Sequence, residues 1–169
     1  MMGQKSHGPN PQVSSALSSY MIYVSEEGID LDAFVTHGGR LAGREDPVAL
    51  ARDLTHLCEK IETLHTLHPR LAAQLQFLAD FIAAGATEAP ETVRNEATFA
   101  LLYATKEEDM IPDALPDIGY CDDAAVTEIV LYRHAEFFEQ HCFDRGIDWN
   151  ALRLGGDTMN RPHSGRSGN

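Results

Sequence analysis

Two runs of leucine and isoleucine within residues 47–82, PVALARDLTHLCEKIETLHTLHPRLAAQLQFLADFI, decide the fold class of this chain. In both runs the large apolar side chains recur every three or four residues, and this spacing places each run on one face of an α-helix. The runs consist of Leu50, Leu54, Leu57, Ile61 and Leu64, and of Leu71, Leu75, Leu78 and Ile82. The sequence therefore predicts two consecutive amphipathic helices.

The residues between and around the two runs indicate where each helix begins and ends. Asp46 is a suitable N-cap, and Pro47 suits the first turn because the first N–H groups of a helix have no partner within it. His68 precedes Pro69, and the residue before a proline is disfavoured in helical conformation, so the first helix should end there. We expect the two helices to form an antiparallel hairpin or to meet at a sharp bend. Both runs should face the chain's own core, with a homodimer seam as the alternative.

Two more helices are predicted further along the chain. The first, over residues 90–107, has apolar residues on both sides, which indicates a central position. The second, over residues 122–145, has Asp122 or Asp123 as its N-cap and Gly146 after its end. Residues 25–46 are polar and rich in glycine, so we interpret them as a long connection with about one helical turn. The chain is therefore predicted to be all-α, a small bundle of four main helices with an acidic loop between the third and fourth.

The length and composition of the chain favour one folded domain. It has 169 residues, of which 43% are hydrophobic and 23% are charged, and these values are typical of a globular domain. We expect a single helical domain over residues 12–154. Residues 1–11 and 155–169 are rich in Gly, Ser, Asn and Pro, so we expect a disordered arm and a disordered tail.

The charge of the chain narrows the classes of partner. Asp and Glu number 26 against 13 Lys and Arg, for a net charge of −13 and an isoelectric point near 4.8. Such a field repels nucleic acid and anionic lipid and favours cations or a basic protein. No apolar run approaches the roughly 20 residues of a membrane-spanning helix. The cysteines form no CxxC pair and no export signal is evident, so we expect a soluble, cytoplasmic protein.

The acidic loop over residues 107–123, EEDMIPDALPDIGYCDD, is the most distinctive part of the sequence. It resembles the D-x-I-P-D-x-x-P-x-x-G-x-x-D-D signature of the YkvA-like domain, a bacterial family of unknown function. The matching residues are Asp109, Ile111, Pro112, Asp113, Pro116, Gly119, Asp122 and Asp123. The resemblance covers about residues 90–135 and implies no reaction or substrate. Family members often have strongly apolar helices around this motif and can be associated with membranes, but the charged residues of the flanking helices make membrane association unexpected here.

Three interpretations of the acidic loop remain open. The carboxylates can be architectural, holding turns and capping a helix. They can instead bind a divalent cation such as Mg²⁺ or Ca²⁺, with Asp109, Asp113, Asp122 and Asp123 as ligands, because hard cations prefer several oxygen atoms. The third interpretation is a docking surface for a basic protein.

His134 is the candidate catalytic residue. We interpret it as a structural histidine bound to a carbonyl or carboxylate group, and the alternative is an acid/base residue that faces Asp113 or Asp123. The sequence contains no motif for a nucleophile or for a phosphate-binding loop, and it indicates no cofactor beyond the possible divalent cation. A non-catalytic interaction or scaffold protein is therefore predicted, with a protein partner or a second copy of the chain. The alternative is a divalent-metal-dependent hydrolase that uses the aspartates of the loop.

Overall fold

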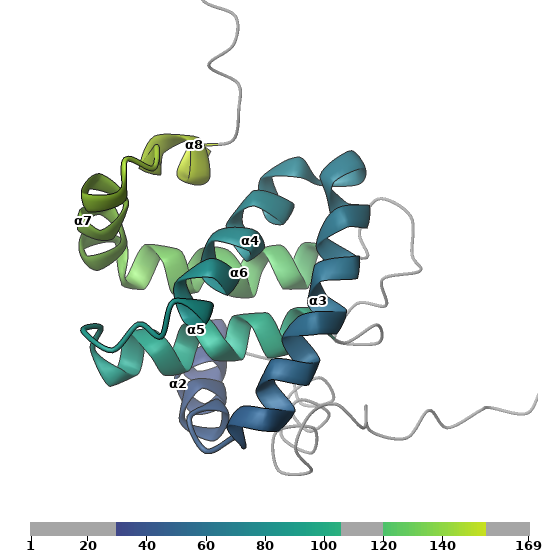
Figure 1. Cartoon of the computed structure of the whole chain (residues 1–169), viewed down its shortest axis with the longest axis vertical. Helices are drawn as coiled ribbons and strands as arrows, with labels where there is room; N and C mark the ends of the chain where they lie inside the picture. The colour runs from purple at the N-terminus through teal and green to yellow at the C-terminus, as the bar shows by residue number, and fades with distance from the viewer. Residues whose placement is uncertain (1–29, 106–119, 155–169) are drawn as a thin grey trace, which may run out of the picture.

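The computed structural model describes residues 30–105 and 120–154, and within these residues all regular structure is helical. The described helices are α2 Leu31–Ala42, α3 Pro47–Leu67, α4 Pro69–Ala83, α5 Glu91–Ala104, α6 Cys121–Arg133, α7 Ala135–Arg145 and α8 Trp149–Leu154 (Figure 1). The all-α prediction is confirmed. The prediction of four main helices is not confirmed, because the described residues contain seven helices of different lengths. The predicted arm over residues 1–11 and the predicted tail over residues 155–169 lie outside the described residues.

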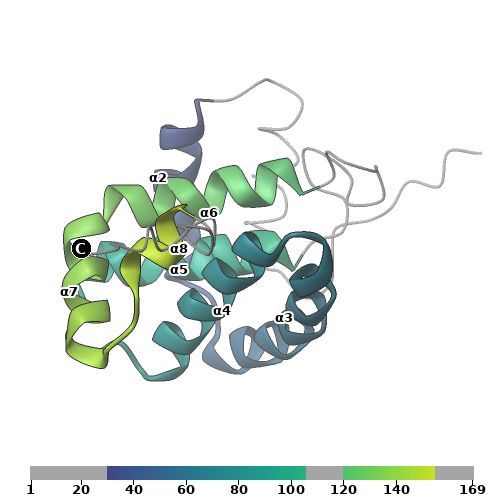
Figure 2. The same cartoon turned by 90° about the horizontal axis from the view of Figure 1, so that it is seen from above.

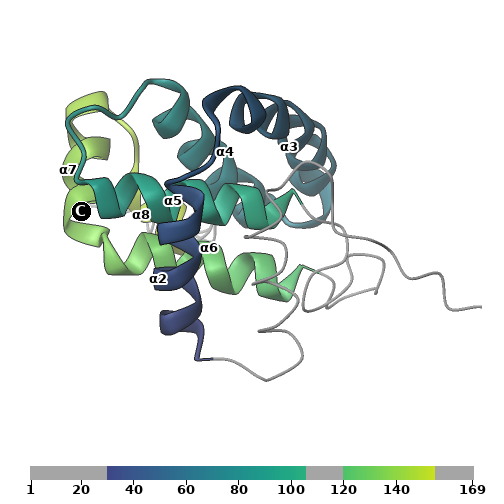
Figure 3. The same ribbon diagram turned by 90° about the horizontal axis from the view of Figure 1, so that it is seen from below.

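Helix α5 is the central element, as its apolar residues on both sides predict. Every residue from 96 to 104 is buried, and the helix contacts α2, α3, α4 and α6. Helices α5 and α6 lie side by side and run in opposite directions, while α2 crosses them (Figures 1 and 3). The rings of Phe34, Phe99 and Tyr103 meet edge to face where α2 crosses α5.

Helices α3 and α4 form at the predicted positions and for the predicted reasons. The Asp46 side chain accepts a hydrogen bond from the Ala49 N–H at 3.1 Å, and Pro47 occupies the first turn. The backbone leaves helical conformation at His68 (φ −139°, ψ 67°), and α4 starts at Pro69.

The leucine runs of α3 and α4 pack into the chain's own core. The most buried members are Leu57, Ile61, Leu64, Leu71, Leu75 and Leu78. Leu50, Leu54 and Ile82 are partly buried and pack against the same core. The intramolecular interpretation is therefore confirmed, and a homodimer would need a different surface.

Helix α2 corrects the interpretation of residues 25–46 as a long connection. The Asp30 carboxylate caps the helix by accepting hydrogen bonds from the N–H groups of Asp32 at 3.0 Å and Ala33 at 3.3 Å. Gly38 and Gly39 weaken a helix in isolation, but here they face α5. A Cβ atom at Gly38 would lie 2.4 Å from the Phe99 ring. The glycines therefore allow α2 to approach α5 closely, and this packing stabilises a helix that local propensity disfavours.

The predicted helix over residues 122–145 is two helices, α6 and α7. The backbone departs from helical geometry at His134 (φ −111°, ψ 25°), and α7 turns away from the direction of α6 (Figure 2). This turn lets Phe138 of α7 reach the rings of Phe77 and Phe81 on α4, with centroids 5.5 and 5.4 Å apart. Gly146, in left-handed conformation at φ 67°, ends α7 as predicted.

The N-cap of α6 also differs from the prediction. Tyr120 holds that position, without a side-chain capping bond, and Asp122 and Asp123 lie in the first turn. Their side chains are buried and have other partners, described below. No helix in the described part of the chain is long and apolar enough to cross a bilayer.

Candidate functional site

The structure describes the final part of the acidic motif. Asp122 and Asp123 lie in the first turn of α6. The other motif residues, Asp109, Ile111, Pro112, Asp113, Pro116 and Gly119, lie outside the described residues. The candidate site therefore centres on the two described carboxylates.

Asp123 forms a buried ion pair with Lys60 of α3. The Nζ atom lies 3.0 Å from Oδ2, and the Asp123 side chain is fully buried while that of Lys60 is 14% exposed. The same ammonium lies 5.4 Å from the centre of the Tyr120 ring, close enough for a cation–π contact. A charge removed from water needs such compensation because desolvation costs several kcal/mol per ion. The pair therefore attaches α3 to the start of α6.

Asp122 connects α6 to α5 through a hydrogen bond. The hydroxyl group of Tyr103, which is buried near the end of α5, donates a hydrogen bond to Asp122 Oδ2 at 2.8 Å. Tyr120 also contacts the ring of His68, with centroids 5.0 Å apart, at the junction of α3 and α4. We call Lys60, Tyr103, Tyr120, Asp122 and Asp123 the α6 cluster. It joins three helices next to the point where the acidic loop enters α6.

Lys60 and Tyr103 were not predicted as partners of the motif. Lys60 lies three residues after Leu57 and four before Leu64, on the same side of the helix as the apolar run. This position indicates that its alkyl chain lies near the core. This position is the feature of the sequence from which a partly buried lysine could have been predicted. Its partner, however, is 63 residues away in sequence, and helical periodicity says nothing about contacts over such a separation.

Another buried carboxylate, Glu96 of α5, binds His134. Glu96 Oε2 lies 2.8 Å from His134 Nε2, and Glu96 Oε1 lies 3.4 Å from a guanidinium nitrogen of Arg133. Arg133 also donates to the Thr36 hydroxyl of α2 at 2.8 Å. His134 therefore has a carboxylate partner, as the structural interpretation requires, and this partner comes from α5. Asp113, one of the two predicted alternatives, lies outside the described residues. Asp123, the other alternative, binds Lys60 instead.

Replacing His134 by phenylalanine is expected to lower the free energy of unfolding by about 1.5–3 kcal/mol. The substitution keeps a ring at the bend between α6 and α7 but removes one hydrogen bond to the Glu96 carboxylate. The Arg133 guanidinium still compensates the negative charge of Glu96. Chemical denaturation measures the change. As the control, His65→Phe at an exposed position of α3 should change stability by less than about 0.5 kcal/mol. Equal effects at the two positions would contradict a bonding role for His134.

The predicted divalent-cation site remains a prediction. Within residues 30–105 and 120–154, no three His, Cys, Asp or Glu side chains are grouped so that they could hold a metal ion. Two of the four predicted ligands, Asp109 and Asp113, lie outside these ranges. Of the other two, Asp123 contacts an ammonium group and Asp122 a hydroxyl group.

Burial changes the acidity of two other groups. It raises the pKa of the Cys142 thiol to about 11, with a smaller contribution from the Asp148 carboxylate, so this cysteine is protonated at neutral pH and is a poor nucleophile. Burial also lowers the pKa of His141, and nearby Arg145 acts in the same direction. His141 lies among phenylalanine rings, its centroid 5.2 Å from that of Phe81. Both groups therefore favour their neutral forms and belong to the packing of α7.

Asp53 of α3 is expected to destabilise the folded chain at neutral pH. Its side chain is 2% exposed, and burial raises its pKa although Arg52, 3.6 Å away, opposes the shift. Because the pKa is raised on folding, the native state binds more protons, and the contribution of Asp53 to stability falls as pH rises through the folded-state pKa. We expect Asp53→Asn to raise the thermal midpoint at neutral pH.

The effect of Asp53→Asn should disappear below the ordinary carboxyl pKa of 3.8, because the carboxyl is then protonated in both states. Thermal unfolding at neutral and acidic pH measures the difference. Glu59→Gln, at an exposed position of the same helix, is the control and should leave the midpoint nearly unchanged. A lower midpoint for Asp53→Asn at neutral pH would show that the carboxylate is stabilising.

A comparison of the chain with protein-family models, with curated proteins and with solved structures found no match.

Proposed function

We propose that the chain is a YkvA-like helical protein that acts by binding another protein and catalyses no reaction itself. The observation that carries this proposal is that Asp122 and Asp123 both bind side chains of the same chain. Tyr103 binds the first and Lys60 binds the second, at 2.8 and 3.0 Å. Carboxylates held in this way fix the start of α6 against α5 and α3, so they serve the architecture of the motif.

The outer surface supports a role in binding. A net charge of −13 favours a basic partner and makes association sensitive to salt. Two large aromatic side chains, Tyr132 and Phe143, are 82% and 80% exposed. Aromatic residues are enriched among the residues that dominate binding energy at protein interfaces. The proposed partner is therefore a basic protein, with a second copy of the chain as the other outcome.

Thermal unfolding of the EDTA-treated chain, with and without Mg²⁺ or Ca²⁺, tests the architectural role of the aspartates. We expect Asp113→Asn and Asp123→Asn to lower the midpoint and neither cation to raise it beyond the effect of a monovalent salt at matched ionic strength. A cation-specific rise that both variants abolish would overturn the proposal, because ligand binding stabilises the state that binds. It would favour the metal-dependent hydrolase instead.

The binding role is tested by capturing partners at low salt and rebuilding the complex from purified components. We expect the dissociation constant to increase with salt, and the double variant Tyr132→Ser, Phe143→Ser to bind at least about tenfold more weakly. Val48→Ser, at a position that is 77% exposed on α3, is the matched control. Sedimentation velocity of the chain alone detects self-association. Failure to form either complex would contradict the proposal.

A further inference from the structure

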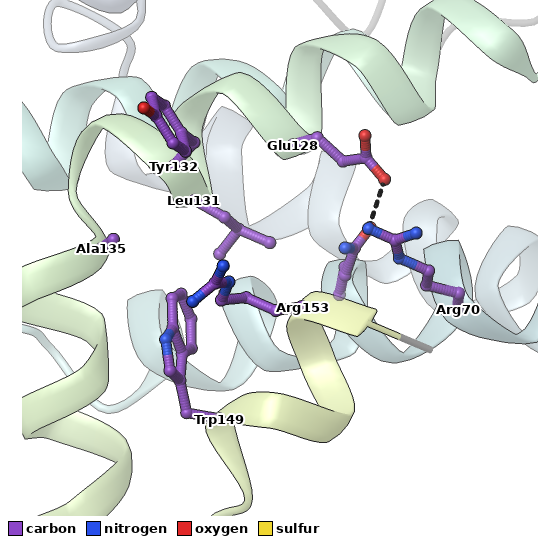
Figure 4. A pocket seen from close by; sticks show the side chains of 8 residues that line it. Arg70, Glu128, Leu131, Tyr132, Ala135, Trp149 and Arg153 are labelled. Carbon is purple, nitrogen blue, oxygen red and sulfur yellow. Dashed lines mark ion pairs between the residues drawn. The ribbon is translucent and has the colours of Figure 1, made fainter. Parts of the chain in front are cut away.

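A pocket of about 250 Å³ lies where α4, α6, α7 and α8 meet (Figure 4). Its apolar wall is formed by Leu131 of α6, Ala135 of α7 and Trp149 of α8. The volume corresponds to about eight water molecules at ~30 Å³ each. A single aromatic ring with a short side chain, or an alkyl chain of similar size, matches this space.

Two buried polar groups beside the pocket have bonding capacity left over. Gln74 of α4 donates through Nε2 to the Leu152 carbonyl at 3.0 Å, which fixes its amide. Its Oε1 atom and the Nε1 atom of Trp149 are buried without a hydrogen-bond partner among the described residues, and both residues line the pocket. Unbonded buried groups are uncommon in native proteins. Both atoms have almost no exposed surface, so a ligand in the pocket would be held by its charged rim and its apolar wall.

The mouth of the pocket is positively charged, although the chain as a whole is strongly acidic. Arg70 and Arg153 lie at its edge with one carboxylate, Glu128. Arg70 is paired with Glu128 at 2.8 Å, whereas Arg153 has no ion pair within the described residues. In Figure 4 the Arg153 guanidinium lies between Leu131 and Trp149. One uncompensated guanidinium therefore stands directly beside the apolar wall.

We propose that this pocket binds a small monocarboxylate that carries one aromatic ring or a short alkyl chain. Its carboxylate binds Arg153, whose planar guanidinium matches a carboxylate through two parallel hydrogen bonds. Its apolar part lies against Leu131, Ala135 and Trp149. A monoanion fits better than a phosphate group because Glu128 already neutralises Arg70. This inference does not depend on the protein-binding role proposed above.

Trp149 makes the test direct, because it is the only tryptophan of the chain and it lines the pocket. The full chain is titrated with 3-phenylpropionate while tryptophan fluorescence is followed, and calorimetry supplies an independent binding constant. We expect a saturable signal. The dissociation constant should be at least about tenfold higher for the neutral 3-phenylpropionamide and for Arg153→Gln, as expected for loss of a charge-assisted contact. Arg44→Gln, at an exposed position after α2, should bind like the unmodified chain.

A second variant separates occupation of the pocket from binding elsewhere. Ala135→Phe places a ring in the pocket and should abolish binding while unfolding remains cooperative. Equal affinity for the acid and the amide would overturn the carboxylate assignment. Binding that survives Ala135→Phe, or no saturable change by fluorescence and calorimetry, would overturn the site itself.

Discussion

Replacing Lys60 by methionine is expected to reduce the free energy of unfolding by about 3–5 kcal/mol, the usual cost of breaking a buried ion pair from one side. Methionine keeps most of the length of the lysine side chain, so packing along α3 changes little. The variant removes the ammonium 3.0 Å from Asp123, whose side chain is fully buried. Asp123 then remains in the interior without the charge of Lys60 beside it. Denaturation by urea, with the slope of the transition checked against the unmodified chain, measures the loss.

An exposed ion pair provides the matched control for Lys60→Met. Arg70 and Glu128 are 2.8 Å apart, but their side chains are 44% and 46% exposed. Solvent screens such pairs, so Arg70→Met should cost less than about 1 kcal/mol. The double variant Lys60→Met, Asp123→Leu should recover most of the lost stability, because an apolar pair often replaces a buried ion pair without loss. A cost below about 1 kcal/mol for Lys60→Met alone would contradict the role assigned to the pair.

Replacing Gly38 by alanine is expected to cost about 2 kcal/mol, although alanine is the better helix former. The new Cβ atom would lie 2.4 Å from two atoms of the Phe99 ring, and Phe99 is fully buried on the central helix. Overpacking of a core costs up to about 3 kcal/mol. Higher helix propensity returns about 1 kcal/mol of this. The midpoint of thermal unfolding should therefore fall.

Gly43→Ala is the comparison that isolates the contact with Phe99. A Cβ atom at Gly43 would also be close to a neighbour, 2.5 Å from the side-chain amide of Asn95. Asn95 is only partly buried, so its amide can rotate away, whereas the Phe99 ring is enclosed by α2 and α5. We expect Gly43→Ala to change stability by less than about 1 kcal/mol. If Gly38→Ala were equally mild, Gly38 would not be required for the approach of α2 to α5.

Local signals in the sequence were sufficient to predict the helices that have a regular apolar pattern. The leucine runs of α3 and α4 and the two-sided apolar character of α5 predict both the presence and the burial of these elements. Asp46, Pro69 and Gly146 mark ends correctly because capping and proline geometry act within a few residues. These features depend on neighbours along the chain, so they can be identified without knowing the fold.

Helix α2 and the bend at His134 could not be predicted in the same way. The pair Gly38 and Gly39 opposes a helix locally, and α2 forms because glycine permits close packing against Phe99. The stretch over residues 122–145 has no proline or glycine to mark a break. It bends where α7 packs its aromatic residues against α4 and where His134 binds Glu96. In both cases contacts with a distant part of the chain outweigh the local preference.

The sequence by itself determined the helical class, the acidic character of the chain and the motif that ends in Asp122 and Asp123. Only the tertiary structure decided what those carboxylates bind, because Lys60 and Tyr103 reach them from α3 and α5. It alone also brought Arg153 and Trp149 of α8 to the pocket with Leu131 and Ala135. Periodicity reports which face of a helix is buried, whereas the partner of a buried charge depends on how helices distant in sequence cross, and that is set by the packing of the whole core.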